Sequence, residues 1–457
     1  MEEAFFKFFD WLAGQLWGWP MLVLIAACGI VFTLGTGFFQ IRHLPFIFRE
    51  TLGKVIRRDA LKGEGTITPF QAISAALAGT IGNGNIAGVA TAIALGGPGA
   101  VFWMWLMAIL GMMTKFVEVT LAVLYREQRP DGTFYGGPMY YIEKGLGAKW
   151  KPLSMFYGVM MILGALGTAV WVQPSTMATA LHTTFKIEPI YTVVVSVVLT
   201  ALVVFGGFKR IGRFSEKITP FLVIFYVFFS VGVILVNITH LPRVFIDIFR
   251  YAFNSHAAIG GFAGATVMQT LQRGASRGTF SNEAGLGTAP MVHATAITDH
   301  PCNQALYGAM EVFIDTMVMC TMTAIVILCA APDLWHNGQT GVELTFSGFR
   351  SLYGGFGQSI VAITVTLAAL TTMIGYYFEY KTSVVYVFGD KPSTIFLFNV
   401  IWLIPPFIVL EKSVDFVWTV VDVSTGIEGI PNMIALLLLS PAFFKTYKAW
   451  LKDRGLR

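Results

Sequence analysis

Long apolar segments recur along most of this chain and are separated by shorter polar stretches. A helix that crosses the hydrocarbon core of a membrane needs about 20 mostly apolar residues. By that measure the pattern predicts an all-α, polytopic membrane protein with eleven transmembrane helices. The predicted spans are 17–39, 69–96, 99–125, 152–179, 189–206, 218–238, 258–299, 304–331, 356–378, 393–410 and 414–443.

Two of these spans, 69–96 and 258–299, are interrupted by clusters of glycine and polar residues. If they begin two five-helix sets, the chain has an extra N-terminal helix (1–41) followed by repeats at 69–240 and 258–443. An odd number of spans in each set inserts the second set with opposite polarity. Because broken helices at matching positions of inverted repeats indicate a secondary transporter's binding site, we interpret the chain as a single transporter domain.

Composition supports a membrane protein. Hydrophobic residues make up 55% and charged residues 12% of the chain, and the mean hydropathy is +0.67, whereas an ordinary soluble domain carries roughly 25% charged residues. Of the 31 Lys and Arg residues, 22 fall in five stretches that alternate spans place on one side, and six fall on the other. These stretches are 42–68, 126–151, 207–217, 379–391 and the C-terminal tail.

The positive-inside rule puts this basic side in the cytoplasm. The C-terminus is then cytoplasmic and the N-terminus extracytoplasmic, in the cell membrane of a prokaryote. The net charge of +5 therefore reflects topology, and no nucleic-acid partner is expected. We expect the lipid bilayer as the surroundings and a monomer as the working state.

The stretch GTIGNGNIAGVATAIALGG, from Gly79, raises the question of a nucleotide site. Gly82, Gly84 and Ala87 fit the G-x-G-x-x-A fingerprint of dinucleotide-binding folds. That fingerprint needs a preceding β-strand and an acidic residue about 20 positions later. Both flanks here have the pattern of a membrane helix, and the first acid after the stretch is Glu118. We therefore exclude a nucleotide site.

Polar residues inside this stretch indicate a broken helix instead. Thr80, Asn83 and Asn85 fall at mid-membrane depth, where irregular backbone is tolerated only inside protein or beside a cavity. We predict a break around 80–85. Free N–H groups near Asn83 to Asn85 would attract a carboxylate, and free carbonyls from Ala78 to Ile81 would suit Na⁺. A carboxylate and a cation in one cleft are typical of a cation-coupled amino-acid carrier.

Several motifs resemble one known family. GGPGAVFWMWLMAILG, Gly96 to Gly111, matches the signature of the alanine/glycine:cation symporters, also called sodium:alanine symporters. The resemblance implies a LeuT-type five-plus-five fold with one extra N-terminal helix, and co-transport of Na⁺ with a small neutral amino acid. Other matching stretches are IGNGNIAGVATA from Ile81, GGPMYYIEKGL from Gly136, GGFKRIGRFSEKITP from Gly206, RGTFSNEAGLGTAP from Arg277, EVFIDTMVMCT from Glu311 and IPNMIALLLLS from Ile430.

The resemblance also implies roles for individual residues near the break. It assigns the substrate carboxylate to Gly82, Asn83 and Gly84, with Asn83 in place of the commoner Thr or Val. Asn85 would hold substrate or ion through its amide oxygen. Thr80 lies among them and is included as a substrate contact.

Residues on other helices complete the implied site. Gln173 stands where the family carries a pocket glutamine, although the two residues after it differ from the usual Ala-Asn. Thr371 and Thr372 match a Ser-Thr pair whose hydroxyls would complete a Na⁺ shell with the carbonyls of Ala78 and Ile81. Tyr376 stands where most members have Trp, which enlarges the pocket and argues against strict selectivity for alanine or glycine.

The second interrupted span, 258–299, contains the glycines of TVMQTLQRGASRGTFSNEAGLG. We predict an unwound segment within 270–282 whose backbone contacts the substrate amine and the ion; a kink without a ligand role is the alternative. Phe280 would supply an apolar wall. The candidate substrate contacts are Thr270, Gly274, Gly278, Phe280, Ser281 and Asn282.

Acidic residues inside predicted spans need partners, because an isolated charge at mid-helix costs about 2.5–3.5 kcal/mol. We expect Glu311 and Asp315 to pair with Arg273 or Arg277. Lys115 and Glu118, three apart, are expected to pair with each other.

Two alternatives remain beside Na⁺ symport. In one, a proton drives uptake, with Asp315 or Glu283 as the titrating group. In the other, the protein is a channel, although the sequence has no repeated pore filter. We do not expect an enzyme, because the chain has no Ser/His/Asp, HExxH or paired catalytic carboxylate pattern.

Overall fold

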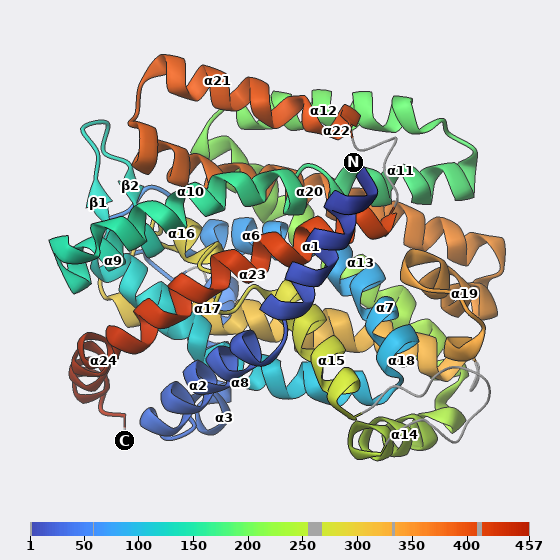
Figure 1. Ribbon diagram of the computed structural model, residues 1–457. Coiled ribbons are helices and arrows are strands. Elements are labelled where there is room, and N and C mark those ends of the chain that lie inside the picture. Colours follow the sequence, from blue (N-terminus) through green and yellow to red (C-terminus); the bar gives the residue numbers. More distant parts are fainter. Residues whose placement is uncertain (1, 58, 255–266, 331–333, 409–413, 457) are drawn as a thin grey trace.

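The computed structural model describes residues 2–57, 59–254, 267–330, 334–408 and 414–456. In these residues the fold is helical apart from one antiparallel pair, β1 (Glu127–Gln128) and β2 (Phe134–Tyr135). Many of the long helices run roughly along one axis and pack into a single bundle (Figure 1). The protein is therefore a helical bundle, as the apolar pattern predicts.

Six helices in the described part of the chain are long and apolar enough to cross a membrane, so a polytopic protein is confirmed and the count of eleven is not. Helices do occur at every predicted span, but several are short or divided. The predicted span 152–179 consists of α10 (Lys151–Thr168) and α11 (Val172–Phe185). The six long helical segments, two of which combine successive labelled elements, are Phe6–Gly35, Gly99–Leu124, Phe208–Val236, Pro301–Ala330, Gly355–Phe388 and Phe416–Leu438.

The first half of the chain supplies the helices up to α14. The longer ones are α1 (Glu2–Leu16), α2 (Trp19–Gly35), α6 (Pro69–Thr80), α8 (Gly99–Leu124), α12 (Pro189–Val204), α13 (Phe208–Val236) and α14 (Leu241–Phe253). The shorter ones are α3 (Phe39–Arg42), α4 (Leu44–Glu50), α5 (Leu52–Arg57), the π-helical turn η1 (Gly84–Gly88), α7 (Val89–Gly96) and α9 (Pro138–Leu146).

The second half contributes the remaining helices. They are α15 (Val267–Asn282), α16 (Ala289–His293), α17 (Pro301–Val312), the π-helical segment η4 (Phe313–Cys320), α18 (Thr321–Ala330), α19 (Gly341–Tyr353), α20 (Gly355–Phe388), α21 (Pro392–Leu403), α22 (Pro405–Ile408), α23 (Val414–Leu438) and α24 (Ser440–Arg454). The sequence pattern did not predict α14 and α19, which are too short to be read as membrane spans.

Two helices form the interior of the bundle. α8 is almost entirely buried and packs against α2, α15 and α17. α20 contacts α6, α10, α11 and α13. Both helices carry glycine at close contacts: a methyl group built on Gly111 of α8 would lie 3.0 Å from Ala284, and one on Gly375 of α20 would lie 2.7 Å from the backbone nitrogen of Gly79 in α6. Small residues of this kind allow helix backbones to approach closely in membrane proteins.

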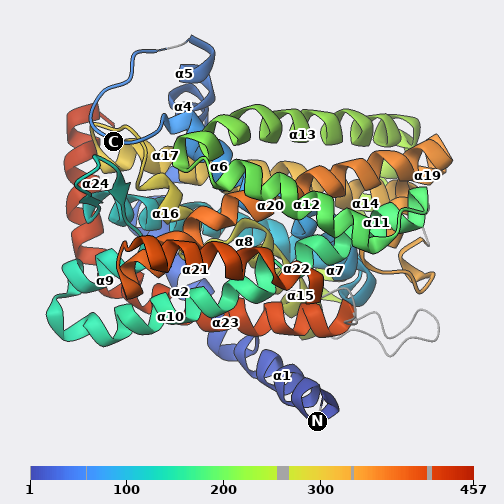
Figure 2. The same cartoon turned by 90° about the horizontal axis from the view of Figure 1, so that it is seen from above.

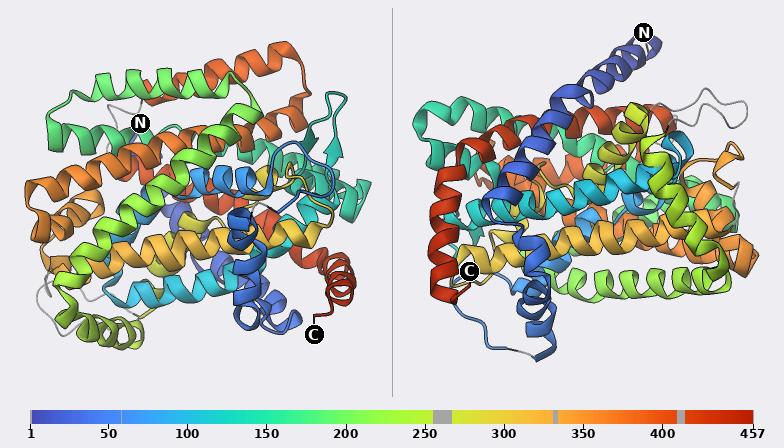
Figure 3. Two further views of the ribbon diagram at one scale, coloured as in Figure 1. Left: turned by 180° about the vertical axis from the view of Figure 1, so that it is seen from behind. Right: turned by 90° about the horizontal axis from the view of Figure 1, so that it is seen from below.

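The segments predicted to be cytoplasmic gather at one end of the bundle. Arg126 donates to the carbonyl of Glu64 at 2.8 Å and to that of Ala294 at 3.0 Å. The ring of Tyr135 in β2 packs against Phe208 and Phe378. α24 crosses this end at a steep angle to the bundle (Figure 3), whereas α1 projects from the bundle on its way to the N-terminus (Figure 2).

Candidate functional site

The predicted break between α6 and α7 is confirmed, and it falls at Ile81 and Gly82. α6 begins with a capping box in which Thr68 and Gln71 bond each other's backbone, and it ends at Thr80. Ile81 is extended, with φ −74° and ψ 90°, before helical geometry resumes at Asn83. All residues of the break are buried.

Asn85 stabilises the break from inside. Its amide oxygen accepts a hydrogen bond from the Gly82 N–H at 2.9 Å, which in a continuous helix would bond the carbonyl of Ala78. The side-chain amide nitrogen of Asn85 donates to the Asp315 carboxylate at 2.6 Å, and the backbone carbonyl of Asn85 accepts from the Thr323 hydroxyl at 2.7 Å. The amide oxygen predicted to hold substrate or ion therefore holds the backbone of the break in this structure.

Side chains from two other helices meet the break at Gly82. The hydroxyl of Thr372 in α20 donates to the Ile81 carbonyl at 3.4 Å. A methyl group built on Gly82 would lie 2.7 Å from the Thr372 hydroxyl and 3.3 Å from the Gln173 amide oxygen in α11. Asn83 instead reaches the start of α11, where it donates to the Val172 carbonyl at 3.0 Å. Gly82, Gln173, Thr372 and Ile81 are thus brought together.

The four predicted Na⁺ ligands are only partly oriented toward one point. Thr372 faces the Ile81 carbonyl, but the Thr371 hydroxyl donates to the carbonyl of Ala368 in its own helix at 2.9 Å. Ala78 lies against α20, since a methyl group built on Gly375 would lie 3.1 Å from the Ala78 carbonyl carbon. These oxygens have the chemistry of a hard-cation site.

The second unwound segment is not where we predicted it. α15 runs without interruption from Val267 to Asn282, so the prediction of unwinding within 270–282 is wrong. The chain unwinds directly afterwards, where Glu283, Gly285 and Gly287 have φ of 55°, 96° and 87°. Glycine adopts this left-handed geometry without steric cost at Gly285 and Gly287, which keeps the chain from resuming a helix there.

Three predicted contacts in α15 face neighbouring helices rather than the break. The Thr270 hydroxyl donates to the Gly96 carbonyl at 3.0 Å. A methyl group on Gly274 would lie 2.8 Å from Trp103 Cβ, and one on Gly278 would lie 3.5 Å from Met104 Cα. The two glycines therefore permit close packing of α15 on α8.

Phe280 and Ser281 do lie beside the break. A methyl group on Gly84 would lie 3.1 Å from Ser281 Cα and 3.2 Å from the Phe280 ring. Ser281 donates to Asp315 at 2.9 Å. Asn282 is next to them but donates to Thr316 at 3.1 Å.

The buried charges are paired differently from our predictions. Asp315 accepts hydrogen bonds from Asn85, Ser281 and Thr316, so the prediction of an arginine partner is wrong. Arg277 instead pairs with Asp422 of α23 through two bonds of 2.8 and 3.0 Å. The Arg277 guanidinium also lies 4.7 Å from the centre of the Trp418 ring, a cation–π contact.

Lys115 does not form the predicted pair with Glu118. Its ammonium lies 3.5 Å from Glu311, which also binds His293 at 2.9 Å. Glu118 accepts from Asn432 at 2.6 Å. An ion pair for Glu311 was therefore correctly predicted, but with a lysine in place of an arginine.

Tyr376 faces the second unwound segment. Its hydroxyl donates to the Glu283 carboxylate, and its ring borders Gly79 of α6. Glu379, one helical turn later, was overlooked because the predicted span ended at 378, whereas α20 continues to Phe388. Asp422 was overlooked as well, although an acid inside an apolar segment is a sign of function.

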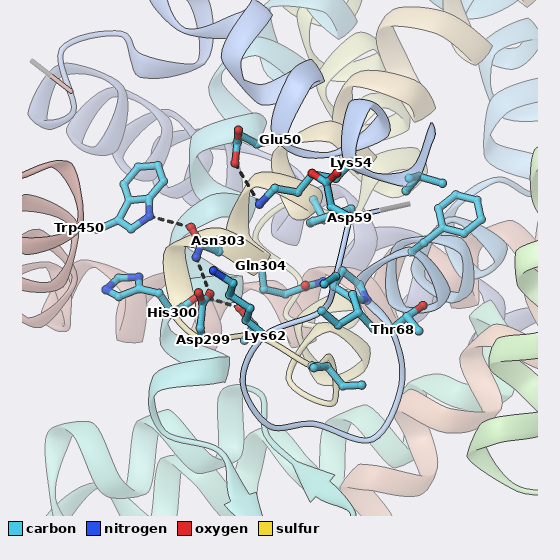
Figure 4. A pocket seen from close by; sticks show the side chains of 18 of the residues that line it. Glu50, Lys54, Asp59, Lys62, Thr68, Asp299, His300, Asn303, Gln304 and Trp450 are labelled. Atoms are coloured by element: carbon cyan, nitrogen blue, oxygen red, sulfur yellow. Dashed lines mark hydrogen bonds and ion pairs between the residues drawn. The ribbon is translucent and has the colours of Figure 1, made fainter. Parts of the chain in front are cut away.

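The described part of the chain has one small cavity near the break and a larger one at an end of the bundle. One of about 60 Å³ lies next to the break and is lined by residues that include Ala87, Val172 and Trp418. The other, of about 790 Å³, lies at the end of the bundle that gathers the basic segments, and Figure 4 shows Glu50, His300, Gln304 and other side chains around it.

A buried helix break, faced by hydroxyl and amide side chains in a bundle of apolar helices, defines a membrane transport protein. The chain belongs to the sodium:alanine symporter family, whose sequence profile matches residues 2–456. The protein is therefore a multi-pass membrane transporter and not an enzyme.

Relatives support this assignment along the whole chain. The sodium/alanine symporter AgcS of Methanococcus maripaludis is 40% identical over 96% of both chains. The probable sodium/glutamine symporter GlnT of Bacillus subtilis is 37% identical over 96% of this chain and 89% of its own.

A solved structure has a similar fold. The manganese transporter of Eremococcus coleocola aligns with a TM-score of 0.55 at 12% identity and covers 83% of each chain. At this identity the likeness concerns the fold alone. It is to a manganese transporter and not to a protein named as LeuT-type, so the LeuT-type arrangement remains a prediction.

Proposed function

We propose that this protein couples the inward movement of Na⁺ to the uptake of a small neutral amino acid, alanine or glycine, by alternating access. The observation that carries the proposal is the buried break at Ile81 and Gly82, with Thr372 and Gln173 directed at it. Each charge that moves inward gains about 2.3 kcal/mol per 100 mV. That energy permits roughly 50-fold accumulation of a neutral substrate for each co-transported ion.

The substrate carboxylate binds at the start of the helix that follows the break. Asn83 and Gly84 are the first residues after the extended segment, and the first N–H groups of a helix have no partner within it. The helix dipole adds attraction for an anion at this end. Gln173 and Ser281 border the same backbone and supply polar groups, while Phe280 closes the site with an apolar wall.

Na⁺ binds at the end of α6, between that helix and α20. The carbonyl of Ile81 and the hydroxyl of Thr372 are its first ligands, because they already meet. Ala78 and Thr371 complete the shell after Thr371 turns away from Ala368. Oxygen ligands of this type hold hard cations at about 2.3–2.6 Å. Substrate and ion then bind to the two sides of one break, so each orders the backbone that the other needs.

A small substrate is supported by the close packing around the break. A single methyl group on Gly82 would already collide with Thr372. The Methanococcus relative is named a sodium/alanine symporter and the Bacillus relative a probable sodium/glutamine symporter. Because these two amino acids differ in size, the property to be measured is the size of the substrate side chain that the carrier accepts.

The proposed architecture is a LeuT-type five-plus-five inverted repeat, 69–240 and 258–443, after the extra N-terminal helix at 1–41. It is supported by the unwound segments at Ile81–Gly82 and at Glu283–Gly287, which interrupt the first helix of each half. The basic segments and the C-terminus face the cytoplasm, the N-terminus faces the outside, and the carrier works as a monomer.

Uptake of labelled alanine and glycine into liposomes that contain the purified protein tests the proposal. We expect accumulation when Na⁺ is high outside, and loss of accumulation when choline replaces Na⁺ at constant pH. Accumulation that persists in choline and follows a pH gradient would reject Na⁺ coupling in favour of the proton-driven alternative.

A further inference from the structure

α14 begins where the chain leaves a membrane-spanning helix. The apolar part of α13 runs to Val236, and a single 3₁₀ turn, Ile238–His240, leads into α14. With 13 residues, α14 is about 20 Å long, too short to cross a hydrocarbon core of about 30 Å. It lies near the end of the bundle away from α24 (Figure 1). The position of α14 is therefore that of a helix at a membrane surface.

One face of α14 is fixed to the bundle, where it packs on α8, α15 and α18. The buried side chains of this face are Val244, Ile248 and Ala252. The indole nitrogen of Trp103 in α8 donates to the Ala252 carbonyl at 3.1 Å. A methyl group built on Gly99 would collide with the Tyr251 carbonyl, so glycine lets the two backbones meet. These contacts determine which faces of α14 point outward.

The next face of α14, which we call the apolar flank, consists of Phe245, Ile246, Phe249 and Phe253. The exposure of these side chains ranges from 38% at Phe245 to 63% at Ile246. Spacings of three and four residues place them on one side of the helix. An amphipathic helix in a membrane interface buries such a side about 5–10 Å into the boundary between headgroups and acyl chains. The apolar flank therefore fits a lipid surface.

The third face, which we call the polar flank, carries Arg243, Asp247, Arg250 and Asn254. Arg243 and Asp247 form an ion pair of 3.5 Å. Two arginines and one aspartate leave this flank with one net positive charge, and the Arg250 side chain is exposed. Basic residues on the polar side of an interfacial helix attract anionic headgroups. The polar flank thus has the charge that a lipid phosphate requires.

Aromatic rings connect the apolar flank to the membrane-spanning α8. The Phe102 ring lies 5.0 Å from Phe253 and 5.6 Å from Phe249, and the Trp105 ring lies 6.1 Å from Phe245, between centroids. The indole nitrogen of Trp105 donates to the Thr321 hydroxyl at 2.8 Å. Aromatic side chains are enriched where membrane proteins pass from hydrocarbon to water. The apolar flank is therefore continuous with the surface of a helix that crosses the membrane.

We propose that α14 binds the surface of the phospholipid bilayer. The apolar flank inserts between acyl chains, and Arg250 on the polar flank contacts the phosphate of an anionic phospholipid. Continuity with α8 and the positive charge beside the apolar flank favour a bilayer over a second copy of this chain. Binding of α14 to lipid is independent of the Na⁺ and amino-acid site, so the measurements below hold whichever ion drives uptake.

Spin labels on single introduced cysteines test the insertion in liposomes, because all four native cysteines are buried. Oxygen concentrates in the bilayer, whereas a water-soluble nickel complex, supplied on both sides, stays outside it. We expect the ratio of oxygen to nickel collision rates to be about threefold or more higher at Ile246→Cys than at Asn254→Cys. Phe228→Cys in α13 gives the reference value for lipid and Lys452→Cys that for water, since both positions are exposed.

Two results would overturn the proposed insertion. A ratio at Ile246→Cys as low as that at Lys452→Cys would mean that the apolar flank faces water. Low collision rates with both reagents at Ile246→Cys would mean that protein covers the flank, in favour of a second copy of the chain.

The phosphate contact is tested with a fluorophore on Ile246→Cys and with brominated phospholipids as quenchers. We expect phosphatidylglycerol to be preferred over phosphatidylcholine about fivefold at this position, and less than about twofold when Arg250→Gln is added. Lys186→Gln removes an exposed charge at the end of α11 and is the matched control, which should keep the fivefold preference. A preference that Arg250→Gln leaves unchanged would reject the contact with phosphate.

Discussion

At the residue scale, Gly82 and Thr372 are the residues on which the proposed site depends most. Gly82 lies in the extended segment and has no side chain to fill the space between the break, Thr372 and Gln173. The Thr372 hydroxyl donates to the Ile81 carbonyl within the break. Under the proposal, small changes at either residue should therefore act on substrate or ion directly.

Gly82→Ala should abolish most transport. The added methyl group would lie 2.7 Å from the Thr372 hydroxyl, and overpacking of this kind costs about 1–3 kcal/mol, which corresponds to roughly 5- to 150-fold weaker binding. The measurement is alanine binding to the purified protein together with uptake. Gly355→Ala is the matched control, because a methyl group there meets nothing within 4 Å. Normal binding by Gly82→Ala would show that the substrate lies elsewhere.

Thr372→Ala should raise the Na⁺ concentration for half-maximal uptake by about tenfold, equivalent to about 1.4 kcal/mol, because a hydroxyl ligand is lost. Thr371→Ala is the natural comparison. Its hydroxyl bonds Ala368 in its own helix, so the increase should be less than about threefold, about 0.7 kcal/mol. Equal effects of the two substitutions would contradict the assignment of Thr372 as the first ligand.

At the element scale, α15 differs most from the sequence-based prediction. The helix is continuous through Gly274 and Gly278 because these glycines accommodate α8, and it ends where Glu283, Gly285 and Gly287 take positive φ. Its other face is tied to α23 by Arg277 and Asp422. Both side chains of this pair are largely buried, at 5% and 17% exposure, so the pair joins two helices of the bundle close to the break.

Asp422→Asn should lower the free energy of unfolding by about 3 kcal/mol, because it leaves the Arg277 guanidinium buried without its carboxylate. Thermal unfolding of the purified protein measures this as a lower Tm. Asp247→Asn provides the control. Its partner Arg243 is 65% exposed, and exposed pairs contribute less than about 1 kcal/mol.

The double variant Arg277→Gln with Asp422→Asn separates an ion pair from two independent contacts. It should recover part of the lost stability, since no unpaired charge is left. Additive losses in the double variant would mean that the two side chains do not act as a pair.

At the scale of the whole molecule, the distribution of basic residues is the basis for the predicted orientation of the bundle in its membrane. The basic segments 42–68 and 126–151 meet at one end, where α24 also lies. The N-terminal α1 projects from the bundle well away from that end (Figure 2). This arrangement suits a carrier whose basic end faces the cytoplasm.

Single introduced cysteines can test this orientation, because all four native cysteines are buried. A reagent that cannot cross the membrane should label Asp10→Cys in intact cells. Lys452→Cys should react only after permeabilisation. Both positions are exposed, so reaction of Lys452→Cys in intact cells would reverse the predicted sidedness.

Much of the fold was predictable from local pattern, because apolar length and glycine content act within a single segment. The break near Gly82 was predicted for this reason and is confirmed at Ile81 and Gly82. The predicted unwinding within 270–282 was wrong, since Gly274 and Gly278 serve packing, and only the neighbouring α8 reveals that role. Among the candidate contacts, Phe280 and Ser281 are beside the break and Thr270 is not.

A multi-pass helical transporter with a broken helix near residue 81 could be predicted without any structure, because hydropathy and backbone preference are properties of neighbouring residues. Which buried charge meets which partner became visible only once the helices were placed in space. Lys115 binds Glu311 and Arg277 binds Asp422 across long separations in the chain. In a medium without water each buried charge must find its partner within the protein, and that choice depends on how the helices pack.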